Sequence, residues 1–322
     1  MLPLSHTQNK VSLRREWDKP IIAKFSKNLG RKLAYFGLPG PDIEDFKDWG
    51  QYLGWKTGIE FISNSGKERE DQRRKINQLQ TNVMINGFSD DWELRKGSLE
   101  DIILKGYDID GYPPAFLHIE KNQLSRMTYE LHNWDFQGGL GYRTKKNEDV
   151  KRIEAIKRII VLQKTHPFIF LLTINVRHTL GDELMNYLID QSKELQSQNY
   201  KSILEWYSKQ GASQKTEHIR LKAVVPLFIR RMAEIYSFDC FCYPPVYYQG
   251  WKDHMIHFVF LLEPKRTVLP CFSDQKLVEV IDLPIIYAEE GVFKLSEQQH
   301  PNFSSENTIA LIQTLNLPVI FR

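Results

Sequence analysis

The sequence is poor in cysteine and has no long apolar run. Its 322 residues include three cysteines, Cys240, Cys242 and Cys271. They offer neither a framework of pairs nor the C-x-x-C spacing of a zinc site, so we expect reduced thiols, no metal and a cytoplasmic location. We find no run of 18 apolar residues and no apolar leader, and therefore expect neither a membrane span nor a secretory signal.

The motifs of several enzyme classes are also missing. The sequence has no Walker loop, no His-Cys-Asp cluster with metal-ligand spacing, and no arguable Ser-His-Asp order, so a kinase or a hydrolase has no support. Hydrophobic residues make up 42% of the chain and aromatic residues 12%. This composition can bury a full core, and the length suits one large domain or one domain with an appendage.

Charge is distributed unevenly between the two ends of the chain. Residues 1–40 hold eight Lys or Arg against two acidic residues, whereas residues 267–322 hold three against seven. A basic end can attract nucleic-acid phosphates or an acidic protein partner. The alternative is an ordinary solvated helix face.

Residues 32–60 have the pattern of an opening β-α-β unit. A short apolar run at 33–36 meets the turn Gly37-Leu38-Pro39-Gly40. Asp42 stands where a helix N-cap is expected, and Gly54 is expected to end that helix. A second strand at 56–62 then carries Glu60 about 20 residues after the turn, the distance at which such units place an acid that receives ribose hydroxyls.

Alternating strand and helix patterns continue along the chain. We predict a helix at 13–29, interrupted at Pro20 and ended by Gly30, and an antiparallel pair of strands at 238–248 and 254–262. Between them we predict, in order, a helix at 65–80, a strand at 82–86, a hairpin of 115–120 with 127–134, a helix at 151–163, a strand at 168–176 and helices at 181–209 and 217–236. Two apolar runs follow in the tail, at 278–287 and 315–321.

From about residue 33 to residue 262, this order of elements resembles a class I S-adenosylmethionine-dependent methyltransferase. The resemblance implies an α/β fold, a Rossmann-like, mainly parallel sheet with helices on both faces and an antiparallel last strand. It divides the chain into a basic helical segment at 1–30, the methyltransferase-like domain at 31–265 and a small C-terminal appendage at 266–322. It also implies S-adenosylmethionine as the cofactor.

The resemblance further implies which residues hold that cofactor. Gly37, Leu38 and Gly40 would lie under its methionine part, and Glu60 would bind the ribose hydroxyls. Acidic residues entering a short apolar segment at 102–104 would lie near the adenine, namely Glu100 and Asp101. We therefore expect a cleft at the carboxyl ends of the strands, lined by this turn, by Glu60 and by Asp135.

The acceptor side of the site follows from Asp135-Phe136-Gln137-Gly138, which is similar to the Asp-Pro-Phe-Gly motif of some tRNA and nucleic-acid amino-methyltransferases. Asp135 would be catalytic and orient the acceptor. Phe136 or Tyr142 would stack on its ring, and Arg177 would contact a substrate phosphate. These roles imply a methyltransferase that acts on nucleic acid.

The sequence also departs from the family pattern. The usual Gly-x-Gly-x-Gly is reduced to Gly37 and Gly40, and the prolines at 39 and 41 remove two N–H donors. The alternative is therefore a catalytically inactive module, a binding or scaffold subunit of a bacterial multi-protein system such as one for antiviral (phage) defence. In that reading, the two glycines form a tight turn, Glu60 is an exposed strand-end acid and Asp135 caps a loop.

Overall fold

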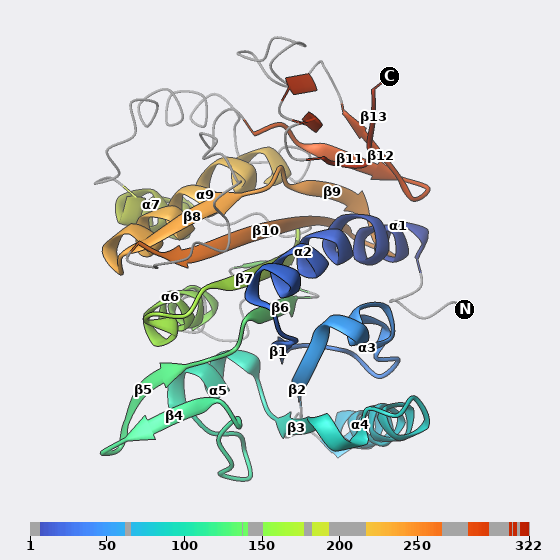
Figure 1. Ribbon diagram of the computed structural model, residues 1–322, viewed down its shortest axis with the longest axis vertical. Coiled ribbons are helices and arrows are strands. Elements are labelled where there is room, and N and C mark those ends of the chain that lie inside the picture. The colour runs from blue at the N-terminus through green and yellow to red at the C-terminus, as the bar shows by residue number, and fades with distance from the viewer. Residues whose placement is uncertain are drawn as a thin grey trace.

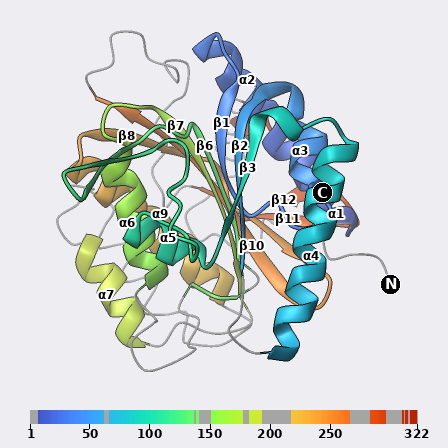
Figure 2. The ribbon, with the colours of Figure 1, turned by 90° about the horizontal axis from the view of Figure 1, so that it is seen from below.

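The computed structural model describes residues 7–61, 66–136, 138–140, 151–176, 182–192, 217–265, 283–295, 309–310, 312–313 and 316–321. In these residues, one large sheet runs through the molecule with helices on both faces (Figures 1 and 2). Its strand order is β13-β12-β11-β9-β10-β7-β6-β1-β2-β3, and β8 pairs with β10. The strands β4 (Leu117–Glu120) and β5 (Gln123–Met127) form a separate hairpin.

Five neighbouring strands form the parallel half of the sheet. In spatial order they are β3 (Trp92–Lys96), β2 (Leu53–Glu60), β1 (Leu33–Gly37), β6 (Leu131–Asp135) and β7 (Phe168–Asn175). Every residue of β7 is buried. The apolar run predicted at 168–176 is therefore a central strand that is covered on both faces.

The other half of the sheet is mixed. The strand β10 (His254–Pro264) runs antiparallel to β7, to β8 (Phe238–Cys242) and to β9 (Val246–Gln249). The prediction of an antiparallel strand at 254–262 is confirmed. Cys240 and Cys242 lie on one face of β8 as buried free thiols, whereas Cys271 lies outside the described residues.

Two groups of helices cover the two faces (Figure 2). One face carries α5 (Leu99–Lys105), α6 (Lys151–Gln163), α7 (Asp182–Ser192) and α9 (Glu217–Ile235). The opposite face carries α1 (Gln8–Ser12), the π-helix η2 (Leu13–Asp18), α2 (Lys19–Leu29), α3 (Glu44–Trp49) and α4 (Gly66–Ile85). Each face has its own apolar core. None of the described helices is long and apolar enough to cross a membrane.

The described part of 266–322 extends the same sheet. The strand β11 (Ile286–Glu289) pairs in parallel with β9 and antiparallel with β12 (Val292–Leu295), which pairs with β13 (Val319–Phe321). The predicted C-terminal appendage thus continues the main sheet beyond β9 (Figure 1).

Three predicted boundaries near the N-terminus need correction. Asp42 is not the N-cap: α3 begins at Glu44 and follows Ile43, whose φ is 49°. Gly54 does not end that helix, because it lies within β2. The helix predicted at 13–29 is divided into η2 and α2 and is preceded by α1, although it does end at Gly30, which has a φ of 67°.

The strand predicted at 82–86 is wrong, because these residues continue α4 to Ile85. Ile76, Leu79 and Val83 are all buried, so the apolar residues follow helical spacing and not alternation. The third strand is instead β3. The hairpin prediction was right in kind, but the run 127–134 divides between the hairpin strand β5 and the core strand β6.

Candidate functional site

Three of the predicted site residues stand at the ends of neighbouring parallel strands. Gly37 ends β1, Glu60 ends β2 and Asp135 ends β6. The register pairs Gly37 with Gly58 on one side and with Asn133 on the other. Glu60 and Asp135 each lie two residues beyond that row, so they project from the same edge and toward the same face of the sheet.

The turn after β1 is shaped by close backbone contacts. A Cβ on Gly37 would lie 2.2 Å from the carbonyl oxygen of Asn133, to which the backbone N–H of Leu38 donates a hydrogen bond at 3.1 Å. Gly40 has a φ of 66°, and its carbonyl oxygen accepts from the N–H of Ile43 at 3.3 Å. The close contact at Gly37 and the positive φ at Gly40 therefore favour glycine at both positions, whether or not a ligand binds.

Replacing Gly37 with Ala should destabilise the protein, because the added Cβ collides with the backbone of β6. We expect the free energy of unfolding to fall by roughly 1 to 3 kcal/mol, the usual cost of overpacking. Gly54→Ala is the matched control, since a Cβ at Gly54 would have its nearest neighbour at 3.5 Å. Denaturant unfolding of both variants checks this, and equal stability would contradict the close contact.

Glu60 is partly withdrawn from water at the end of β2. Burial raises the pKa of its carboxyl to about 7, and Lys75 on α4 partly opposes that rise. The side chain is neither fully exposed nor fully buried. A partly desolvated carboxyl favours hydrogen-bond donors such as hydroxyls, because they stabilise its charged form.

Glu100 and Asp101 lie in the first turn of α5, and both already bind basic residues of α6. The Glu100 carboxylate accepts from Nε of Arg152 at 2.7 Å, and that of Asp101 lies 3.4 Å from Nζ of Lys151. These ion pairs join the two helices. A ligand that used either carboxylate would compete with its ion pair.

The predicted acceptor residues are only partly described. The Phe136 side chain is 4% exposed, and the guanidinium carbon of Arg152 lies 4.1 Å from its ring centroid. The ring thus packs in the core, and a stacking role would require Arg152 to move. Tyr142 and Arg177 lie outside the described residues.

Asp135 is held by the N-terminal helix. Its Oδ2 lies 2.5 Å from Nζ of Lys10 on α1, and the two side chains are 30% and 15% exposed. Its Oδ1 is buried and has no hydrogen-bond partner in the described part of the chain. One oxygen of the carboxylate is therefore neutralised, and the other still has the capacity to accept a hydrogen bond.

A buried acid lies beneath the same turn. Oδ2 of Asp45 on α3 accepts hydrogen bonds from Nδ2 of Asn133 at 2.6 Å and from the Tyr35 hydroxyl at 3.2 Å. Burial raises the pKa of Asp45 to about 7, and the charge of Arg14 partly lowers it. Sequence reasoning missed Lys10, Asp45 and Asn133, because their contacts join segments that no local pattern links.

A Thr-His-Asp chain lies in the core close to this network. Nδ1 of His257 lies 2.8 Å from Oγ1 of Thr173, and its Nε2 lies 3.0 Å from Oδ1 of Asp18. All three residues are 3% exposed or less. The chain therefore ties η2 to β7 and β10, and does not present a nucleophile to a substrate. Among the described residues, no group of three His, Cys, Asp or Glu could hold a metal ion.

The strand order decides the fold class. From one edge, β3-β2-β1-β6-β7-β10-β8 runs parallel except for the reversed β10, which lies between β7 and β8. The fold is Rossmann-like and of the methyltransferase type. This confirms the fold that the sequence predicted, with a mainly parallel sheet, helices on both faces and an antiparallel last strand.

Solved structures of similar topology include two O-methyltransferases. TomG of Streptomyces achromogenes, involved in tomaymycin synthesis and in complex with SAM, is 11% identical over 76% of this chain and 80% of its own, with a TM-score of 0.36. An O-methyltransferase of Bacillus cereus in complex with SAH is 10% identical over 76% and 81%, with a TM-score of 0.37. No protein-family model and no curated protein sequence matches this chain.

Proposed function

We propose that the protein is an S-adenosylmethionine-dependent methyltransferase. The observation that carries this proposal is the placement of Gly37, Glu60 and Asp135 at the ends of three adjacent parallel strands. In open α/β sheets, ligands bind at that edge, because strand-end loops and helix N-termini converge there. The glycine turn and the two acids belong to different parts of the chain, and the sheet alone brings them together.

The residues present fit the cofactor in two ways. Glu60 is a half-buried acid whose charged form gains from hydroxyl donors, as a ribose would supply. At the end of the turn 37–40, a Cβ on Gly40 would meet nothing within 4 Å, so a ligand can approach the backbone there. The cofactor supplies an electrophilic methyl group, and the protein has to align the acceptor and exclude water.

Asp135 would orient the acceptor. Its Oδ1 has an unused capacity to accept a hydrogen bond, which an acceptor amine or hydroxyl would reach after a local movement that uncovers this atom, while Oδ2 stays paired with Lys10. Lys10 would then act as a positioning residue, because its ion pair fixes the rotamer of the carboxylate. The edge of α1 thereby becomes one wall of the acceptor site.

A second candidate is a non-catalytic Rossmann module. Two observations favour it. The ion pair with Lys10 occupies one oxygen of Asp135, and the backbone conformation explains both glycines without a ligand. Pro39 and Pro41 also lack the N–H groups that a ligand could use. A role in a phage-defence system remains a hypothesis attached to this candidate.

A nucleic-acid acceptor, or an acidic protein partner, remains a prediction that depends on the basic N-terminal segment. Several basic residues of 1–40 bind carboxylates of the protein itself, namely Lys10, Arg14, Arg15 and Arg31. This pairing reduces the positive charge that the segment can offer to phosphates. We therefore propose the methyltransferase without assigning a polyanionic acceptor.

Calorimetric titration with S-adenosylmethionine tests the proposal, and the most specific test is the dependence of the affinity on pH. If the ribose binds ionised Glu60, affinity should rise about tenfold between pH 6 and pH 8, because a group with a pKa near 7 goes from mostly protonated to mostly ionised. Binding at pH 7 should also release protons, which titrations in buffers of different ionisation enthalpy detect.

The matched variant is Glu60→Gln, which cannot ionise. It should bind the cofactor more weakly than wild type at pH 8 by roughly 1.5 to 3 kcal/mol, the range for a hydrogen bond to a charged group. Its affinity should not change with pH over this range. Wild-type protein that shows no binding at millimolar cofactor would favour the non-catalytic module, and binding that is independent of pH would remove Glu60 from the site.

A further inference from the structure

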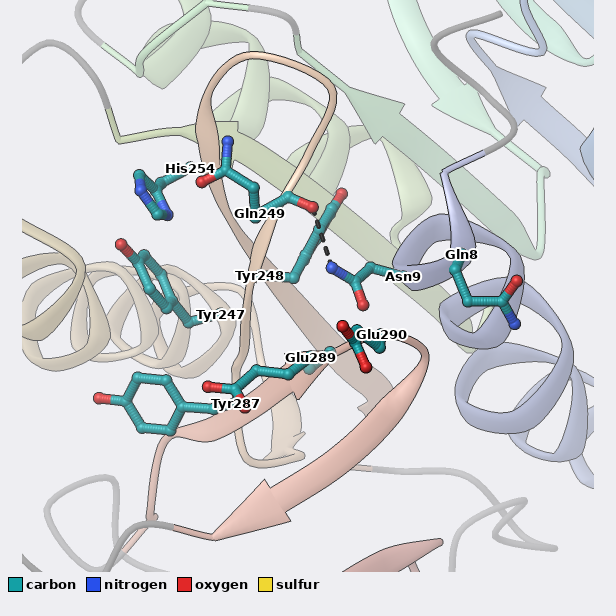
Figure 3. Close-up of a pocket in the computed structure, with 10 residues that line it drawn as sticks. Gln8, Asn9, Tyr247, Tyr248, Gln249, His254, Tyr287, Glu289 and Glu290 are labelled. Atoms are coloured by element: carbon teal, nitrogen blue, oxygen red, sulfur yellow. Dashed lines mark hydrogen bonds between the residues drawn. The ribbon is translucent and has the colours of Figure 1, made fainter. Parts of the chain in front are cut away.

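A cavity lies at the same edge of the sheet as the glycine turn, some strands away from it. It has a volume of about 430 Å³ and lies between α1, the end of β9, the start of β10 and the end of β11 (Figure 3). Small-molecule sites typically measure about 300 to 1,000 Å³. The cavity is therefore large enough for a molecule with one ring and a short side chain.

The frame of this cavity is held by Asn9 of α1. Its Nδ2 donates to the carbonyl oxygen of Gln249 at 3.0 Å, and its Oδ1 accepts from the N–H of Gly291 at 2.8 Å. Gly291 has a φ of 82°, and a Cβ there would lie 2.7 Å from Cγ of Gln8. Asn9 thus braces α1 against both β9 and the turn after β11, so the space between them is preformed.

One wall of the cavity is aromatic. Tyr247 stacks with His254 at 5.3 Å between ring centroids and an interplanar angle of 3°, and Tyr287 meets Tyr247 edge-on at 5.6 Å. In Figure 3, these three side chains lie together on one side of the cavity. His218 stacks on Tyr247 at 4.1 Å, and burial lowers its pKa to about 4. The imidazole of His218, which stacks on Tyr247, is therefore uncharged at neutral pH.

The charge around the cavity is negative. Glu289 and Glu290 both line it, and no Lys or Arg is among the described residues that do. Glu289 is paired with Lys294 at 2.5 Å, whereas Glu290 has no ion pair with another described residue. Aromatic rings attract cations through their negative faces, and a nearby carboxylate adds to that attraction.

We propose that this cavity binds a small molecule that carries an aromatic ring and a positively charged amine, the ring packing on Tyr287, whose described ring contacts are all edge-on, and the amine near Glu290. A nucleic-acid strand would instead bring phosphates toward two carboxylates. This binding site does not depend on the methyltransferase function.

The test uses three probes of similar size and different charge. Tyramine carries the ring and a cationic amine, 2-(4-hydroxyphenyl)ethanol is neutral, and 3-(4-hydroxyphenyl)propionate is an anion. Calorimetry or ligand-observed NMR should show tyramine binding at least about tenfold more tightly than the anion, with the alcohol between them. Cyclohexylethylamine, which lacks the π-system, should bind more weakly than tyramine.

Two variants assign the contacts. Tyr287→Ala should weaken the binding of all three aromatic probes, and Glu290→Gln should reduce the preference for tyramine over the alcohol to less than about threefold. Tyr112→Ala and Glu120→Gln are matched controls, since both residues are exposed and lie outside the cavity lining. Because Glu290 is exposed and lies on a turn, we expect Glu290→Gln to fold like the wild-type protein.

Three results would overturn the proposal. The first is that no probe binds at 10 mM, which is roughly the weakest affinity of interest. The second is that the anion binds as tightly as the amine, and the third is that a short single-stranded oligonucleotide displaces tyramine. Because the probes are titrated without cofactor, their binding is measured separately from that of S-adenosylmethionine. A protein that binds tyramine and not the cofactor would keep this inference and reject the methyltransferase.

Discussion

Replacing Asp135 with Ala should lower methyl transfer by at least about 100-fold, with cofactor binding nearly unchanged. The expected loss is that of one preorganised polar contact to the reacting partner. The proposed contact is to the acceptor, because Oδ1 of Asp135 is buried and unpartnered while Oδ2 binds Lys10. Transfer of a labelled methyl group from S-adenosylmethionine to cell-extract fractions, with calorimetry for the cofactor, measures both quantities.

The variant should remain folded. Lys10 and Asp135 are partly exposed, and an ion pair of that kind contributes about 0 to 1 kcal/mol. Glu120→Gln, at the end of the hairpin strand β4, is the matched control and should transfer at the wild-type rate. If Asp135→Ala also keeps the wild-type rate, the ion pair only fastens α1 to the sheet, and Asp135 is not a catalytic residue.

Replacing Asp45 with Asn should stabilise the protein at pH 8 by about 2 to 4 kcal/mol. Burial raises the pKa of this carboxyl from 3.8 to about 7, and one pKa unit corresponds to about 1.4 kcal/mol. Above pH 7, the folded protein carries the full cost of a buried charge, which a neutral amide does not incur. The hydrogen bond from Asn133 can still be made to the amide oxygen.

The direction of the pH dependence follows from the raised pKa. Between about pH 4 and pH 7, the folded state holds a proton on Asp45 that the unfolded state has lost, so stability falls as pH rises through this window. Glu60 acts in the same direction, since burial also raises its pKa to about 7. The advantage of Asp45→Asn should therefore disappear near pH 4. The variant should keep the pH dependence due to Glu60 and to His132 and His218, whose pKa values are lowered by burial and which act in the opposite direction.

Chemical unfolding at pH 4, 6 and 8 measures this dependence. Asp90→Asn is a matched control, because Asp90 is exposed and its replacement should leave the dependence unchanged. A variant of Asp45 that is no more stable than wild type at pH 8, with the same slope between pH 4 and pH 7, would show that the carboxyl is ionised at little cost in the folded protein.

Elements with strong local patterns could be predicted from the sequence. The helix at 151–163, the buried strand at 168–176 and the end of α2 at Gly30 are as predicted, because apolar spacing and glycine chemistry act within a few residues. The helical conformation of residues 82–85 could not be predicted, since a short apolar run fits a helix or a strand, and only the burial of Leu79 and Val83 distinguishes them.

For the candidate site, the sequence by itself determined the alternation of strands and helices and the positions of Gly37, Glu60 and Asp135 at strand ends. Periodicity and turn residues are local properties, so one chain suffices to find them. Only the tertiary structure decided that Lys10 binds Asp135, that Asp45 lies buried against Asn133 and that α1 closes a cavity against β9 and β11. Those contacts, and the shifted pKa values that burial produces, depend on which segments the sheet brings together, and no local pattern encodes that pairing.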